Sequence, residues 1–152
     1  MPGVLLPVPH FEQSRDGTCL PACARMVLAF WGERRSETAV ARQLQSKRFG
    51  TPIGNAVKLE TWHYHVEVGR LNRTDLENHL ANGQPVIARV WTPMLDYWKV
   101  ETSHVVVVVG FDEGFVYLND PAFAIAPQAV LWDAFLAAWA EYDETAVRIN
   151  PI

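Results

Sequence analysis

The central stretch of the chain reads Ser103-His104-Val105-Val106-Val107-Val108-Val109-Gly110. A run of five valines is apolar and β-branched on both faces of a strand. Such a strand is expected only where other elements cover both faces of its sheet. Asp112-Glu113-Gly114 then supplies a hairpin turn into a second strand at residues 115–118. This hairpin is the predicted centre of an antiparallel sheet.

A histidine and a carboxylate flank the hairpin at the same end. His104 stands at the start of the valine strand, and Asp120 follows the second strand within Asn119-Asp120-Pro121. An imidazole beside a carboxylate is the arrangement of a general base whose tautomer is fixed by an acid. Each residue also has a structural alternative, because His104 could cap the sheet edge and Asp120 could form an ordinary turn.

A thiol begins an apolar run with helical spacing much earlier in the chain. Apolar residues recur at three- and four-residue steps over residues 19–31, and Thr18 is the candidate N-cap. The start of a helix stabilises a thiolate, which makes Cys19 a candidate nucleophile. Cysteines in apolar helices are more often packing residues, and Cys23 fits that alternative. Gln13 is a candidate side-chain donor to an oxyanion, together with the Cys19 backbone N–H.

The remaining patterns place helices in the first part of the chain and strands mostly in the last. Further helices are expected after Ser36, in a short piece up to Thr61, after the capping box Thr74-Asp75-Leu76-Glu77, and over Val130 to Trp139. Further strands are expected at residues 64–68, 86–91 and 146–149.

Composition excludes several classes of function. The 152 residues are 49% hydrophobic, which predicts one domain spanning residues 1–152. A net charge of −4 provides no basic field for nucleic acid. The segment Met1 to Phe11 has no basic region and is interrupted by prolines, so we expect neither a signal peptide nor a membrane span.

Cysteine usage points to free thiols. Cys19 and Cys23 lie four residues apart in one predicted helix, where a disulfide would distort the backbone. We therefore expect a reducing compartment and a cytoplasmic location. No second cysteine pair or histidine pair has zinc-ligand spacing, although His63 and His65 flank Tyr64, so we expect neither a metal nor a cofactor.

The segment Gln13-Ser14-Arg15-Asp16-Gly17-Thr18-Cys19-Leu20-Pro21-Ala22-Cys23-Ala24-Arg25-Met26-Val27-Leu28 resembles the active-site motif of bacterial double-glycine leader peptidases. These are papain-like cysteine peptidases, best known as N-terminal domains of bacteriocin-exporting ABC transporters. In the family pattern a Gln precedes the catalytic Cys by six residues, a Cys or small residue follows it by four, and a Met by seven. The resemblance continues through Gly83-Gln84-Pro85-Val86-Ile87, His104-Val105-Val106-Val107 and Tyr117-Leu118-Asn119-Asp120-Pro121.

The resemblance implies an α+β, papain-like fold. N-terminal helices would pack against a C-terminal antiparallel sheet, with the active site in the cleft between them. Cys19 would be the nucleophile, His104 the base, Asp120 the residue that orients the base, and Gln13 the oxyanion donor. The implied substrate is a peptide or protein, cleaved through an acyl-enzyme after small residues such as Gly-Gly. Because the chain carries no transporter helices, we expect a stand-alone member.

Two features bear on the substrate. The family usually has Gly directly after the nucleophile and often Asp before it, where this chain has Leu20 and Thr18. We expect the bulkier Leu20 either to narrow the substrate pocket or to alter the backbone freedom at the helix start, and so to affect the substrate range more than the chemistry. An aromatic-rich segment before His104 either docks an apolar peptide or packs under the sheet, and it contains Trp91, Met94, Leu95, Tyr97 and Trp98. A catalytically silent peptide-binding module and an amide or acyl transferase remain alternative functions. The oligomeric state is not predicted.

Overall fold

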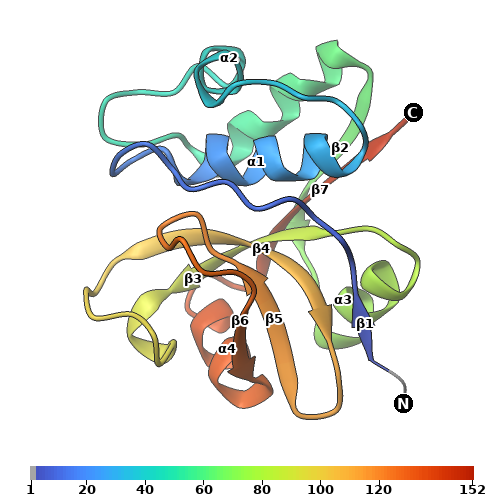
Figure 1. Ribbon diagram of the computed structural model, residues 1–152, viewed down its shortest axis with the longest axis vertical. Coiled ribbons are helices and arrows are strands. Elements are labelled where there is room, and N and C mark those ends of the chain that lie inside the picture. The colour runs from blue at the N-terminus through green and yellow to red at the C-terminus, as the bar shows by residue number, and fades with distance from the viewer. Residues whose placement is uncertain (1–2) are drawn as a thin grey trace.

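The computed structural model describes residues 3–152 and has helices on both faces of one sheet (Figure 1). Met1 and Pro2, which begin the segment predicted not to be a signal peptide, lie outside the described residues. In chain order the elements are β1 (Val4–Leu5), α1 (Cys19–Phe30), α2 (Glu37–Gln43), η1 (Ile53–Trp62), β2 (Tyr64–Arg70), α3 (Arg73–Ala81), β3 (Val86–Trp91), η2 (Thr92–Met94), β4 (Ser103–Phe111), β5 (Phe115–Asn119), β6 (Gln128–Leu131), α4 (Trp132–Ala140) and β7 (Thr145–Pro151). η1 and η2 are 3₁₀ helices.

The sheet has seven strands, and all their pairings are antiparallel. Its order is β2-β7-β3-β4-β5-β6, and β1 pairs with β4 beyond the end of β3. The predicted hairpin is present as β4 and β5, and Oδ1 of Asp112 accepts hydrogen bonds from the backbone N–H groups of Gly114 and Phe115 in its turn. The expected α+β fold with an antiparallel sheet is confirmed.

The valine run of β4 explains why the sheet is covered on both faces. Val105, Val107 and Val109 belong to a core that is covered by α1, α2 and η1, whereas Val106 and Val108 belong to a second core covered by α3 and α4. All five valines are at most 5% exposed. Successive side chains of a strand point to opposite faces, so one apolar run contributes to both cores.

Two local predictions are corrected by the structure, and one strand was not predicted. The capping box of α3 is formed by Asn72 and Asp75, and it begins two residues before Thr74 because Asn72 takes the extended N-cap conformation. Val130 lies in the edge strand β6, and α4 begins after it at Trp132. β1 was not predicted, since two residues carry no periodic signal. The N-cap at Ser36 is confirmed, and its side chain accepts from the Ala39 N–H at 3.0 Å.

The described helices include none that is both long and apolar enough to cross a membrane. The N-terminal segment instead runs along the sheet after β1 before it turns into α1, as the dark-blue trace in Figure 1 shows. Its attachment begins with two backbone pairs to β4, Val4 with Phe111 and Leu5 with Gly110, followed by a hydrogen bond of 2.8 Å from the Leu6 N–H to the Val109 carbonyl.

A glycine in β4 permits this attachment. A Cβ placed on Gly110 would lie within 3.0–3.1 Å of Leu5 atoms and would overlap the Val4 carbonyl oxygen. We expect Gly110→Ala to lower the free energy of unfolding by about 1–3 kcal/mol, because backbone must move to make room. Urea denaturation measures the change, and Gly114→Ala is the matched control, since a Cβ there meets nothing within 4 Å. Equal effects of the two substitutions would contradict this account of β1.

Candidate active site

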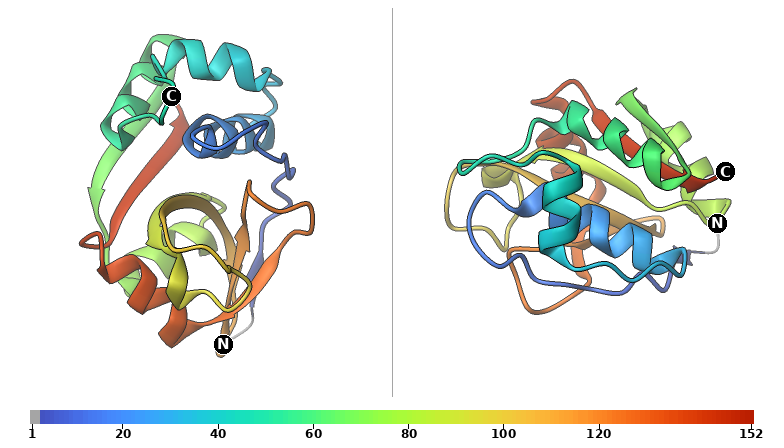
Figure 2. Two further views of the ribbon diagram at one scale, coloured as in Figure 1. Left: turned by 90° about the vertical axis from the view of Figure 1, so that its left-hand side faces the viewer. Right: turned by 90° about the horizontal axis from the view of Figure 1, so that it is seen from above.

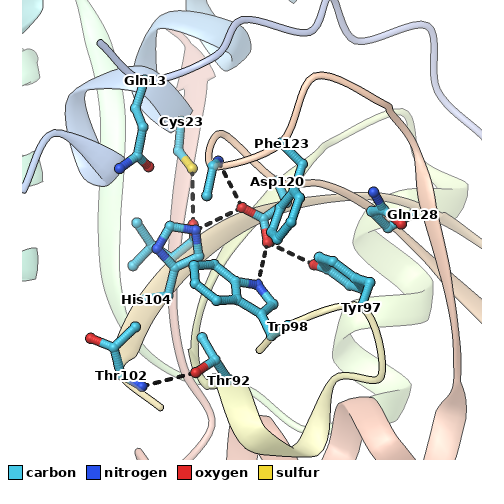
Figure 3. Close-up of polar contacts among 12 residues, drawn as sticks. Gln13, Cys23, Thr92, Tyr97, Trp98, Thr102, His104, Asp120, Phe123 and Gln128 are labelled. Carbon is cyan, nitrogen blue, oxygen red and sulfur yellow. Dashed lines mark hydrogen bonds and ion pairs between the residues drawn. The ribbon is translucent and has the colours of Figure 1, made fainter. Parts of the chain in front are cut away.

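The centre of the site is a buried carboxylate that faces an imidazole. Nε2 of His104 lies 2.7 Å from Oδ1 of Asp120, and the two side chains are 5% and 0% exposed. His104 is the second residue of β4, and Asp120 directly follows β5, so antiparallel pairing brings them to one end of the hairpin. The second ring nitrogen of His104, Nδ1, faces away from Asp120 (Figure 3).

Three further donors complete the coordination of Asp120. The Ala122 backbone N–H donates to Oδ1 at 2.9 Å, while the Tyr97 hydroxyl and the Trp98 indole N–H donate to Oδ2 at 2.7 and 2.8 Å. Figure 3 shows these contacts converging on one carboxylate. The Trp98 ring also packs edge-on against the His104 ring, with centroids 4.8 Å apart. The carboxylate is therefore held on both oxygens, and its position fixes that of the imidazole.

The electrostatics of this cluster favour a charged pair. Burial alone lowers the pKa of His104, but hydrogen-bonding and electrostatic interactions with Asp120 and Cys19 raise it to about 9. Burial raises the pKa of Asp120, yet the hydrogen bond and charge of His104, with the Ala122 and Tyr97 donors, lower it overall. Burial and the neighbouring Asp120 raise the pKa of Tyr97, which keeps its hydroxyl proton as a donor.

Helix α1 positions the thiol over this pair. The buried Cys23 sulfur lies 3.5 Å from the Val105 carbonyl oxygen. This contact fixes the position of α1 along β4. Cys19 is one helical turn before Cys23, about 5.4 Å along the axis, and His104 is one residue before Val105. Cys19, which is partly exposed, lines one cavity with His104 and contributes to raising the pKa of its imidazole. Cys23 is a packing residue, and burial raises the pKa of its thiol well above the usual range.

Gln13 lies on the loop that leads into α1. Its backbone N–H donates to the Pro121 carbonyl at 2.7 Å, which ties this loop to the turn that carries Asp120. Its side-chain Nε2 donates to the Arg15 carbonyl at 3.0 Å, and among residues 3–152 no group hydrogen-bonds its buried Oε1. The amide NH₂ has two hydrogens, so one donor is left for a ligand.

A cavity of about 640 Å³ opens where these groups meet, and Gln13, Cys19 and His104 all line it. Figure 2, left, looks onto the N-terminal end of α1, with the yellow segment between β3 and β4 below it. Two exposed apolar side chains are among the lining residues, Phe49 at 91% exposure and Val100 at 63%.

The residues predicted to bind substrate separate into three groups. Leu20 and Trp98 line the cavity, as expected of substrate contacts. Leu95 is 1% exposed and belongs to the core on the far face of the sheet, so its prediction as a substrate contact is corrected. Trp91 is half-buried in β3 and Tyr97 donates to Asp120, and neither lines the cavity.

The polar roles of Tyr97 and Trp98 were missed by sequence reasoning. Both residues combine an apolar ring with one donor, and such donors find a partner when buried. A Tyr-Trp pair shortly before a candidate catalytic histidine is a signal that could have indicated donors to its acid. Metal chemistry finds no comparable support, since no group of three or more His, Cys, Asp or Glu side chains in the described part of the chain could hold an ion.

Comparisons with known proteins identify a family and agree with the fold. The model of the Peptidase_C39 like family matches residues 5–147. A search of curated protein sequences gave no significant match. A protein from Bacillus anthracis described as a C39-like peptidase superposes with a TM-score of 0.83 at 18% identity, covering 100% of this chain and 99% of that one.

Two transporter-associated structures share the same fold. The peptidase domain of Streptococcus ComA, a bifunctional ABC transporter, gives a TM-score of 0.77 at 17% identity, with 94% of this chain and 98% of that chain covered. A double-glycine-motif protease from an AMS/PCAT transporter, solved with its leader peptide, gives 0.76 at 18% identity, with 98% and 95% covered.

The two thiols differ in accessibility, which leads to a direct prediction. We expect iodoacetamide to modify Cys19 in the native protein and to spare Cys23, because Cys19 lines the cavity and Cys23 is 0% exposed. Mass mapping of peptides after brief labelling measures both sites, and labelling in denaturant gives the reference in which both react. The folded Cys19→Ala variant is the control, and its remaining thiol, Cys23, should stay unlabelled. Modification of Cys23 at a rate comparable to that of Cys19 would contradict the described packing.

Proposed function

The chain belongs to the Peptidase_C39 like family, and on that premise we propose that it is a cysteine peptidase with Cys19, His104 and Asp120 as its triad. The observation that carries the proposal is the pair of His104 and Asp120 at 2.7 Å, with the other ring nitrogen left to meet Cys19. A nucleophile, a base and a group that orients the base are the three parts that thiol catalysis needs.

The proposed reaction starts from a thiolate of Cys19 and an imidazolium of His104, the pair that forms when the thiol proton has moved to Nδ1. The thiolate attacks the carbonyl carbon of the scissile amide, and the tetrahedral intermediate collapses when His104 returns the proton to the leaving nitrogen. A thioester with Cys19 remains. Water then gives a proton to His104 and attacks the thioester, which releases a carboxylic acid and regenerates the thiol. Asp120 stabilises the imidazolium throughout and does not itself become protonated.

The oxyanion would be stabilised by two donors. Cys19 is the first residue of α1, so its backbone N–H has no acceptor within the helix. The second donor is the unused N–H of the Gln13 amide, on the loop beside it. Removing one such donor from an acyl-transfer enzyme typically costs about 10²- to 10³-fold in kcat.

The substrate we propose is a peptide with small residues at the cleavage site, such as Gly-Gly. Leu20 follows the nucleophile directly, and together with Trp98 it fills space that a bulky substrate side chain next to the scissile bond would need. The related AMS/PCAT protease was solved with a leader peptide. Two free thiols, Cys19 and Cys23, fit action in a reducing compartment such as the cytoplasm.

Peptide cleavage is the decisive test. We expect the native protein to generate new amino termini in a mixture of proteome-derived peptides with blocked amines, supplemented with synthetic peptides that contain one Gly-Gly pair. Cys19→Ala should give no products, because no other thiol reaches the cavity, whereas Cys23→Ala should retain activity. Mass spectrometry identifies the products, and melting temperatures verify that both variants fold.

The outcomes separate the candidate functions. Peptides that bind without any new termini would support a silent binding module and contradict a peptidase. With a primary amine added, a free carboxyl on the N-terminal product indicates hydrolysis, and an amide on it indicates transfer. Products that persist with Cys19→Ala would exclude Cys19 as the nucleophile.

The pH dependence of activity tests the role of Asp120. Because the pKa of His104 is raised to about 9, we expect kcat/KM to fall as the pH rises through this value and the imidazolium is lost. In Asp120→Asn the carboxylate that raises the pKa is gone, so the alkaline limb should move to lower pH and activity should drop about 10²- to 10⁴-fold. An alkaline limb that does not move would contradict this coupling.

The raised pKa of His104 also predicts that the free energy of unfolding depends on pH. A histidine with a raised pKa stabilises the fold fully below its unfolded pKa of about 6.5, and this contribution is lost as the pH rises through about 9. Urea denaturation from pH 6 to 10 should therefore show a steeper loss for the native protein than for Asp120→Asn. Asp133→Asn, at an exposed site on α4, is the control and should behave like the native protein.

A further inference from the structure

A guanidinium lines the same cavity as Cys19 and His104. Arg89 lies on β3 opposite Val105 of β4, and both residues line the cavity wall formed by the sheet. Asp16, on the loop before α1, and His104 also line the cavity. The described residues offer Arg89 no carboxylate within ion-pair distance. Its positive charge therefore lies in the cavity without an ion-pair partner.

Two contacts hold the Arg89 side chain in place. Its Nε donates to the Ser103 hydroxyl at 3.1 Å, and its guanidinium carbon lies 4.0 Å from the centre of the Tyr142 ring. Both partners are uncharged, so they orient the group without neutralising it. The terminal nitrogens carry four of the five donors of a guanidinium, and no described hydrogen bond uses them. A planar guanidinium that is held in place with its terminal N–H donors free is preorganised to bind a carboxylate.

We propose that Arg89 is a specificity residue that binds a carboxylate of the substrate, which makes acidic peptides the preferred class. This inference rests on the proposed function, because it concerns the same cavity. The carboxylate would come from an Asp or Glu side chain near the scissile bond or from the C-terminus of the peptide. In either case the charge-assisted pair would be made away from the reacting atoms, so Arg89 selects the substrate and does not take part in bond cleavage.

The test uses Cys19 as a reporter and requires no turnover. Maleimides with a terminal carboxylate on linkers of graded length are compared with the corresponding neutral amides, and their rates of labelling at Cys19 are measured by mass spectrometry. The ratio of acid to amide rates isolates the effect of charge, since both reagents meet the same thiol. At the linker length that reaches Arg89, we expect Arg89→Gln to lower this ratio about tenfold.

Matched variants separate charge from structure. Arg89→Lys should retain part of the preference, and Arg89→Glu should bring the ratio below that of Arg89→Gln. Arg42→Gln, an exposed arginine on α2 outside the cavity, should leave the ratio unchanged. If the role of Arg89 is merely structural, Arg89→Gln should change the labelling rates of the acid and the amide reagent by the same factor. An acid-to-amide ratio equal in the native protein and Arg89→Gln at every length, or a Cys19 that no maleimide labels, would overturn the proposal.

Cleavage-site profiling distinguishes the two sources of the carboxylate. Acidic residues enriched at a constant position relative to the cleaved bond indicate a side chain, and cleavage at a constant distance from the C-terminus indicates the terminal carboxylate. An acid preference in labelling without any cleavage would leave the Arg89 inference standing and contradict the peptidase. Cleavage without any preference for acidic peptides, and with an acid-to-amide labelling ratio that Arg89→Gln leaves unchanged, would support the peptidase and contradict the Arg89 inference.

Discussion

The burial of the Asp120 carboxylate is the constraint on which the rest of the site depends. A carboxylate with 0% exposure is costly unless its oxygens are hydrogen-bonded. Its donors come from three places, namely β4 with His104, the loop before β4 with Tyr97 and Trp98, and its own turn with Ala122. Those segments must meet for the chain to fold. The hydrogen bonds that stabilise the Asp120 carboxylate therefore also bring His104 and the surrounding segments together.

The same constraint extends to the nucleophile through two attachments. The Pro121 carbonyl, directly after Asp120, accepts from the Gln13 backbone N–H, which fixes the loop before α1. The Cys23 thiol contacts the Val105 carbonyl, which fixes α1 along β4. The thiol of Cys19 is thus positioned from both sides, by the loop that precedes it and by the helix turn that follows. Neither attachment involves a residue that reacts, so the geometry is set before a substrate arrives.

Much of this arrangement could be predicted from the sequence, and the parts that could not have a common physical cause. The valine strand and the proximity of His104 to Asp120 follow from periodicity and antiparallel pairing, which act over short distances along the chain. The function of Tyr97, by contrast, depends on which way a non-periodic loop turns, and this is decided by a partner 23 residues away. Leu95 in the same loop turns into the core for the same reason, and an aromatic-rich composition alone does not distinguish the two.

The separation between catalysis and recognition follows from where charge is compensated. The negative charge of Asp120 is met by His104, and its other donors are neutral, so this pair presents little net charge to a ligand. Arg89 is oriented by Ser103 and Tyr142 but is not neutralised by them, so its charge remains available to a ligand in the cavity. Solved relatives at 17–18% identity share the fold. If a cavity residue such as Arg89 selects the substrate, as we propose, a shared fold does not entail a shared substrate.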